Sequence, residues 1–169
     1  AAGFWINISR YALLKLKSRK VVSRNWRPFM LAFVKDIDTR LDLVKIAQYL
    51  GQNRGVLTIA NLRKREEISS VKHRKDLELE MSNKLENHGF EAFCEVHAVD
   101  DFKSGLVEIA IGHGLADLQT NTIVMGLSET IDGLNTQVTC LSRLAHFGHN
   151  IMLCKFNQPL PQKATSIDL

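Results

Sequence analysis

Pro28 is followed by the apolar run Phe29-Met-Leu-Ala-Phe-Val34, and similar runs return at intervals along the chain. A continuous apolar stretch of this length is typical of a strand that is buried on both faces of a parallel sheet. It is far shorter than the roughly 18 to 20 apolar residues that cross a bilayer, so we expect no transmembrane helix. The strands predicted in this way occupy residues 29–34, 56–62, 90–96, 122–125 and 151–156.

Segments of helical periodicity lie between these runs. The first is predicted to begin at an Asp38 N-cap and to end at Gly51, because Leu43 and Ala47 share one face. Apolar stripes predict further helices within residues 77–89, 102–110 and 131–145.

Strands that alternate with helices predict an α/β fold with a five-stranded, mostly parallel sheet and helices on both faces. Apolar and polar positions alternate at 90–96, which favours a place at the edge of the sheet. The polar residues 63–75 are interpreted as a solvated loop, and Asp100-Asp101 as the cap of the helix that follows. A fold of this kind hosts many functions and by itself decides none of them.

Basic residues are concentrated at the start of the chain. The net charge is +4, yet residues 1–35 contain no acid, and the remainder has more acids than bases. The bases of this first segment are Arg10, Lys15, Lys17, Arg19, Lys20, Arg24, Arg27 and Lys35. Trp5, Ile8 and Tyr11 recur at helical spacing, which predicts an N-terminal amphipathic helix. A basic segment with aromatic residues favours the inner surface of a membrane, the alternative being a solvated basic face with no specific partner.

Few residues suggest chemistry. Cys94, Cys140 and Cys154 are widely spaced among apolar neighbours, which indicates reduced, buried thiols and not a disulfide frame or a zinc site. His146 and His149 have i, i+3 spacing, but no third ligand is near them in sequence. No nucleophile elbow, P-loop or dinucleotide fingerprint is found. We therefore expect no enzyme activity, no metal and no cofactor.

Short motifs in this order resemble the start of the C-terminal domain of cation-chloride cotransporters, and they cover residues 9 to about 155. They are Ser9-Arg-Tyr-Ala-Leu-Leu14, Asn25-Trp-Arg-Pro28 directly before a strand, and Asn121-Thr-Ile-Val-Met-Gly126 after Gly114-Leu115. The plain structural interpretation is that Asn25, Trp26, Arg27 and Pro28 build a corner of the fold, because Pro28 fixes φ at the entry to a strand. Asn121 and Gly126 then bracket the fourth strand.

The resemblance implies a fold similar to that of universal stress proteins and a cytosolic regulatory and dimerisation domain without catalysis. The parent would be a membrane cotransporter that couples chloride to sodium or potassium movement, or to both. Residues 1–24 would form a juxtamembrane leader, 25–157 the regulatory domain, and 158–169 a linker or tail. The partners implied are the transporter's own transmembrane domain, a second copy of the domain and the inner membrane surface, at the cytoplasmic face of the cell membrane. Nucleic acid is not expected as a partner, since the body of the chain is acidic.

A nucleotide-binding domain similar to the universal stress proteins is the alternative. The residues to hold the nucleotide would be Lys35, Asp36, Gly126 and Ser128. Glu129, however, stands where the phosphate-binding loop of that fold has its second glycine, and a carboxylate there would repel phosphate. The sequence therefore disfavours this alternative.

Overall fold

The structure is a computed structural model that describes residues 2–17, 27–51, 55–115 and 118–156. Its centre is a five-stranded sheet in the order β3-β2-β1-β6-β7 with every pair of neighbours parallel. The strands are β1 (Phe29–Phe33), β2 (Val56–Lys64), β3 (Phe93–Val99), β6 (Thr122–Gly126) and β7 (Asn150–Cys154). The predicted α/β class and the edge position of the third strand are thus confirmed, and the sheet is wholly parallel.

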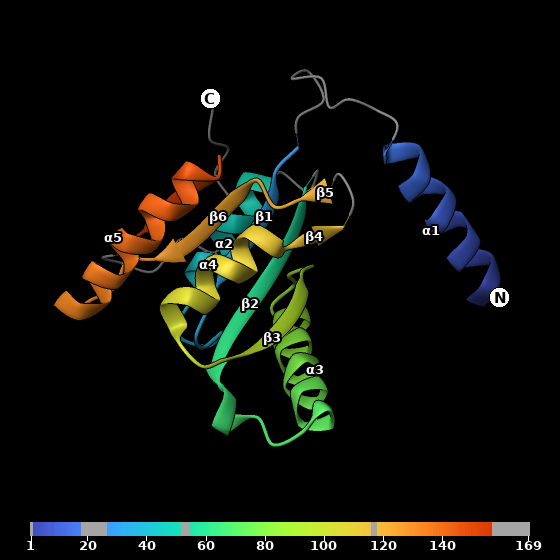
Figure 1. Cartoon of the computed structure of the whole chain (residues 1–169). Helices are drawn as coiled ribbons and strands as arrows, with labels where there is room; N and C mark the ends of the chain where they lie inside the picture. The colour runs from blue at the N-terminus through green and yellow to red at the C-terminus, as the bar shows by residue number, and fades with distance from the viewer. Residues whose placement is uncertain (1, 18–26, 52–54, 116–117, 157–169) are drawn as a thin grey trace.

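Helices cover both faces of the sheet (Figure 1). On one face lie α2 (Leu41–Gly51) and α3 (Val71–Asn87), over a core that contains Leu43, Ile59 and Leu85. On the other face lie α4 (Phe102–Gly112) and α5 (Ile131–His146), over a second core with Leu31 and Leu144. These five side chains are at most 1% exposed, so the central strands are buried on both sides as their apolar runs predict.

Short polar signals fix the ends of the helices. Asp101 accepts a hydrogen bond from the backbone nitrogen of Ser104 at 2.8 Å and so caps α4, as predicted. Thr130 caps α5 through the backbone nitrogen of Gly133. Beyond the end of α5, Gly148 has φ +80°, a conformation that favours glycine.

Three local predictions are wrong. Residues 63–75 are not a loop: β2 runs on to Lys64, a 3-10 turn (Arg65–Glu67) follows, and α3 begins at Val71. The polar sequence there reflects an exposed end of the sheet and a helix of which only Leu85 is fully buried. Asp38 does not cap α2, which begins at Leu41; its carboxylate instead lies 2.9 Å from Lys84 Nζ of α3.

The edge strand also lies three residues later than predicted, because the turn after α3 takes up residues 88–92. An unpredicted two-stranded hairpin of β4 (Gly114–Leu115) and β5 (Leu118–Gln119) leads from α4 to β6.

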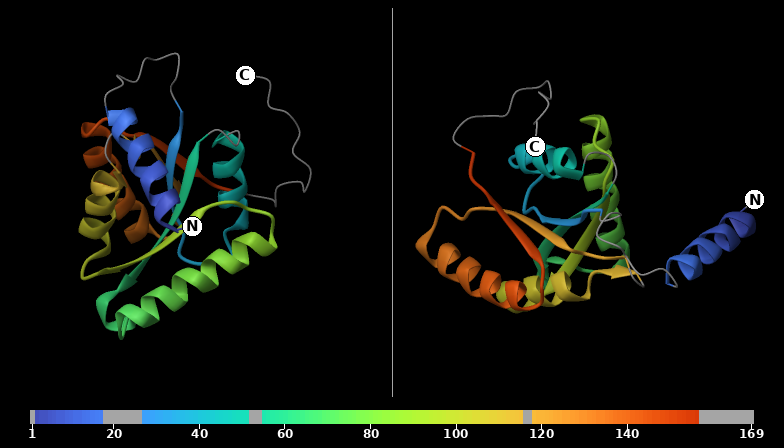
Figure 2. Two further views of the ribbon diagram at one scale, coloured as in Figure 1. Left: turned by 90° about the vertical axis from the view of Figure 1, so that its right-hand side faces the viewer. Right: turned by 90° about the horizontal axis from the view of Figure 1, so that it is seen from above.

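The predicted N-terminal helix is present as α1 (Ala2–Lys17). Figures 1 and 2 show it apart from the two helical layers, on the side of the body where β3 and the β4–β5 hairpin lie. Its exposed apolar side chains include Trp5, Ile6, Tyr11 and Leu14. Among the described residues, no helix is long and apolar enough to cross a membrane.

Candidate functional site

Ligands of open α/β sheets bind at the carboxyl ends of the strands, where the strand order reverses. In this sheet that point lies between β1 and β6. The structure brings the four predicted nucleotide residues to this edge: Lys35 and Asp36 follow β1, and Gly126 and Ser128 end or follow β6. The segments that follow β1 and β6 are therefore neighbours. The contacts of each segment decide whether a ligand could bind between them.

The segment after β1 is held by one buried side chain of the neighbouring strand. Asn61 of β2 is 3% exposed, and its amide nitrogen donates hydrogen bonds to the carbonyl oxygens of Val34 at 2.8 Å and Lys35 at 2.7 Å. The Asn61 side-chain oxygen accepts a third bond, from Arg63 Nε at 3.0 Å. The backbone at this position is therefore occupied internally and is not offered to a ligand.

The segment after β6 is closed by α5. Gln137 donates from Nε2 to the carbonyl oxygen of Gly126 at 2.7 Å and accepts from the backbone nitrogen of Ser128 at 2.9 Å. A Cβ added at Gly133 would collide with the side chain of Ser128, so the loop lies directly on the start of the helix. The backbone nitrogen of Ser128, one of the donors that could face a phosphate, is thus bonded to Gln137.

Arg40 completes this closure. Its Nη1 lies 3.3 Å from the place that a Cβ of Gly126 would take, so the glycine makes room for a guanidinium of the chain itself. The side chain of Glu129, which stands where the second glycine of a phosphate loop is expected, is exposed.

The family motifs meet at the opposite end of the same strands. Asn121 accepts a bond from the backbone nitrogen of Phe29 at 3.2 Å and donates to the carbonyl oxygen of Arg27 at 2.8 Å. The carbonyl oxygen of Pro28 accepts from Val56 at 3.2 Å. Arg27, Pro28 and Asn121 therefore build a corner of the fold, while Asn25 and Trp26 lie outside the described residues. Gly126 belongs to the other end of β6 and does not join this corner.

Sequence analysis missed a groove of about 940 Å³ beside α4. The helix α4 approaches β3 near that strand's end, where Gly105 lies against Val99, and no helix among the described residues covers the start of β3 on this face. Phe93 there is 67% exposed. We call it the α4–β3 groove, and its lining includes Phe29, Val56, Phe93, Glu95, His97, Glu108, Ile109, His113 and Thr120.

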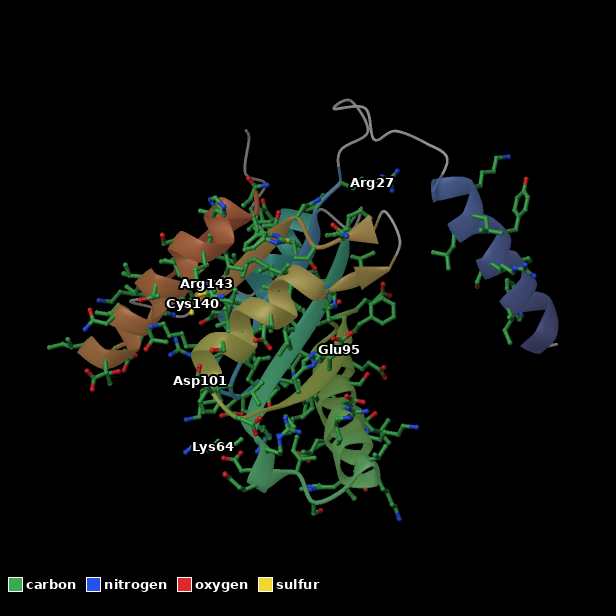
Figure 3. The ribbon with its side chains drawn as sticks, viewed as in Figure 1. Arg27, Lys64, Glu95, Asp101, Cys140 and Arg143 are labelled. Atoms are coloured by element: carbon green, nitrogen blue, oxygen red, sulfur yellow. The ribbon has the colours of Figure 1, made fainter. Side chains whose placement is uncertain are left out.

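A chain of polar side chains crosses the groove. Glu95, marked in Figure 3, has one carboxylate oxygen 3.4 Å from His113 Nε2 and the other 3.0 Å from His97 Nε2. The hydrogen bonds from His113 and His97 hold the pKa of Glu95 well below its usual range, against the opposing effect of burial. On the far side of His113, Nδ1 lies 2.6 Å from the hydroxyl oxygen of Thr120.

This arrangement has the order of a nucleophile, a base and an orienting carboxylate. Thr120, however, is only 4% exposed, and its backbone nitrogen donates to the carbonyl oxygen of His113 at 3.2 Å. The chain Thr120–His113–Glu95–His97 therefore fastens the segment after α4 to the edge strand. From the sequence, only the pair Glu95 and His97 could have been recognised, because residues two apart lie on one face of a strand. The contact of His113 with Thr120 depends on the hairpin between them.

The remaining predicted residues are dispersed. Cys94 is half-buried, Cys140 and Cys154 are buried, and all three are free thiols; desolvation raises the pKa of Cys94 to about 11. The ring of His146 packs edge-on against Phe147. Within the described part of the chain, no three His, Cys, Asp or Glu side chains are grouped as metal ligands would be.

The basic leader is described only in part. Arg10 and Lys15 are exposed on α1, where Lys15 Nζ donates to the hydroxyl oxygen of Tyr11 at 3.2 Å. Lys17 ends the helix, and Arg19, Lys20 and Arg24 lie outside the described residues. A search against known protein families finds no match for this chain.

Proposed function

We propose that this chain is a cytosolic regulatory and dimerisation domain of a cation-chloride cotransporter, and that it performs no catalysis. The observation that carries the proposal is the closed edge between β1 and β6. Because Gln137 and Asn61 take up the backbone groups there, the usual ligand position of the fold is filled by the protein itself. A scaffold of this kind acts through its surfaces and its N-terminal helix.

The link to cotransporters rests on the motifs, and the positions of two of them are compatible with it. The carbonyl oxygen of Arg27 accepts from Asn121 and that of Pro28 accepts from Val56, so residues far apart in sequence serve one corner. The basic helix α1 precedes that corner, as a helix leaving a membrane domain would. In the proposal, α1 conveys the position of the α/β body to the transmembrane part, at the cytoplasmic face of the membrane.

For pairing with a second copy, we propose the free edge of β7 together with α5. Val138 of α5 is 64% exposed and Leu153 of β7 is 39% exposed. Between them, Leu141 and Ile151 line a shallow apolar hollow. Within the described part of the chain β7 is an edge strand, and an edge strand beside an apolar stripe suits a symmetric contact between two copies.

Light scattering over a range of protein concentrations tests the proposal. We expect a dimer whose fraction rises with concentration, is unchanged by ATP, and falls at least tenfold in association constant in Leu153→Arg. The matched control is Leu79→Arg on α3, where the side chain is 60% exposed on the far helical layer; it should leave association unchanged. A monomer at all concentrations would contradict the pairing.

Nucleotide binding in the manner of universal stress proteins is the second candidate, because Lys35, Asp36, Gly126 and Ser128 do lie at one edge. It predicts that ATP raises the thermal midpoint of the protein and that Ser128→Ala removes the rise. If ATP stabilises the protein in this way and no dimer forms, the regulatory proposal is wrong and this candidate replaces it.

A further inference from the structure

We propose that α1 folds back on its own chain and docks in the α4–β3 groove, where it would supply the missing third helix of that face of the sheet. The inference concerns only contacts within this chain, so it does not depend on the proposed function. It starts from two exposed apolar surfaces, one at the start of β3 and one on α1, and these two elements lie on the same side of the body (Figure 2).

The first surface is the uncovered start of β3. Phe93 is 67% exposed and Val56 is 38% exposed, and both line the groove together with Ile109 of α4. Strands of a parallel sheet are normally covered on both faces, because an apolar face left in water costs free energy. The groove is therefore the place where the two-layer cover of this sheet is incomplete.

The second surface belongs to α1. Trp5, Ile8 and Tyr11 lie on one side of the helix and are 64%, 43% and 64% exposed. An isolated helix of 16 residues is only marginally stable in water. A helix of this length and composition gains most of its stability by packing an apolar face against another surface.

The charges of the two surfaces are complementary. The charged side chains of α1 that the structure describes are the bases Arg10 and Lys15. The groove carries the carboxylates of Glu95 and Glu108, and Glu108 is exposed on α4. Lys15 lies one turn from Tyr11 on the face that would dock, so docking brings its ammonium group toward the acidic side of the groove.

The length of the chain allows α1 to reach the groove. Residues 18–28 connect α1 to Phe29, and Phe29 itself lines the groove. A segment of this length spans up to roughly 35 Å when extended, more than the roughly 24 Å length of the helix. Docking would make α1 unavailable to any membrane or partner while it is docked.

Hydrogen exchange followed by mass spectrometry on the full chain tests the proposal. Ile8→Glu places a carboxylate on the docking face, and we expect the amides of 93–99 and 108–114 to exchange at least fivefold faster than in the unchanged protein. Ile6→Glu is the matched control, since Ile6 is 66% exposed on another side of the same helix; it should leave these amides unchanged. Equal rates in all three proteins would overturn the proposal.

A cross-link identifies which copy supplies the helix. Oxidation of the double variant Ile8→Cys with Phe93→Cys should give a disulfide within one chain, seen as a shift in electrophoretic mobility that a reductant reverses, without a change in the number of chains. The pair Ile6→Cys with Phe93→Cys should react at least tenfold more slowly. A cross-linked product made of two chains, or no product, would overturn docking within one chain. Neither result depends on the edge of β7, so the dimer proposal is tested separately.

Discussion

The two ends of β1 differ in how their space is used. At the carboxyl end, Asn61 and Gln137 bond the backbone that a ligand of this fold would use. Toward the amino end, the α4–β3 groove of about 940 Å³ stays open, with Phe93 largely exposed. The position where ligands usually bind in this fold is thus closed. The open groove lies away from that position.

The difference has a physical cause. Two amide side chains each satisfy two backbone groups at the carboxyl edge: Asn61 donates to two carbonyl oxygens, and Gln137 donates to one carbonyl oxygen and accepts from one backbone nitrogen. The groove is open because α4 approaches β3 near the end of that strand, where Gly105 lies against Val99, and it is lined by a charged cluster around Glu95 that tolerates water. Removing a side chain should therefore cost more stability at the closed end than at the open one.

The largest effect is expected from Asn61→Leu. Leucine leaves the carbonyl oxygens of Val34 and Lys35 without their donor, and unpaired buried acceptors cost about 2 to 4 kcal/mol in the free energy of unfolding. Urea denaturation measures the loss. Asn135→Leu, at an exposed position of α5, is the control and should change stability by less than about 0.5 kcal/mol. Equal losses in the two variants would mean that Asn61 does not hold this edge.

An intermediate effect is expected from Gln137→Ala. It removes one donor and one acceptor from a half-buried loop, for a loss of about 1 to 2 kcal/mol. Gln137→Glu keeps the acceptor for Ser128 but sets a carboxylate against the Gly126 carbonyl, and should be no more stable than the alanine variant. If instead the alanine variant gains ATP binding in a thermal shift assay, Gln137 acts as a plug in a nucleotide site.

The parts of the fold that could be predicted are those that depend on residues close together in sequence. The apolar run before Val34 and the cap at Asp101 depend on neighbours in sequence, and the sheet and the start of α4 are found where they are predicted. Asp38 was misplaced because its partner, Lys84, is 46 residues away. The polar stretch 63–75 was misread because an exposed strand end and an exposed helix share the composition of a loop.

The candidate site divides in the same way. Strand order alone brings Lys35 and Gly126 to one edge, so their proximity was predictable from the α/β pattern. The role of Gln137 in closing this edge was not predictable. Nothing in the sequence around this residue distinguishes it from a glutamine that faces solvent. The groove could not be predicted for a further reason: it is defined by the absence of a described helix over β3 on the α4 face.

The smallest effect is expected at the open end, from Glu95→Gln. The carboxylate side chain is 38% exposed, so the interaction with His113 and His97 is screened by solvent and should contribute less than about 1 kcal/mol at pH 6. The pKa of Glu95 is lowered by folding, so its contribution is complete above the pKa of the unfolded chain, about 4.3, and is lost as the pH falls toward the folded value. The gap in thermal midpoint between the two proteins should therefore be constant from pH 6 to 5 and shrink steadily from pH 4 to 3.

Glu91→Gln, an exposed carboxylate four residues earlier, supplies the control and should give no gap that changes with pH. A gap for Glu95→Gln that stays constant down to pH 3 would mean that the charge of Glu95 is not what the imidazoles stabilise, and that the glutamine fits the cluster poorly for steric reasons. Since the variant leaves Phe93 and Ile109 in place, α1 should still protect the groove in it. A loss of that protection at pH 6 would make Glu95 itself, and not only Glu108, a contact of the docked helix.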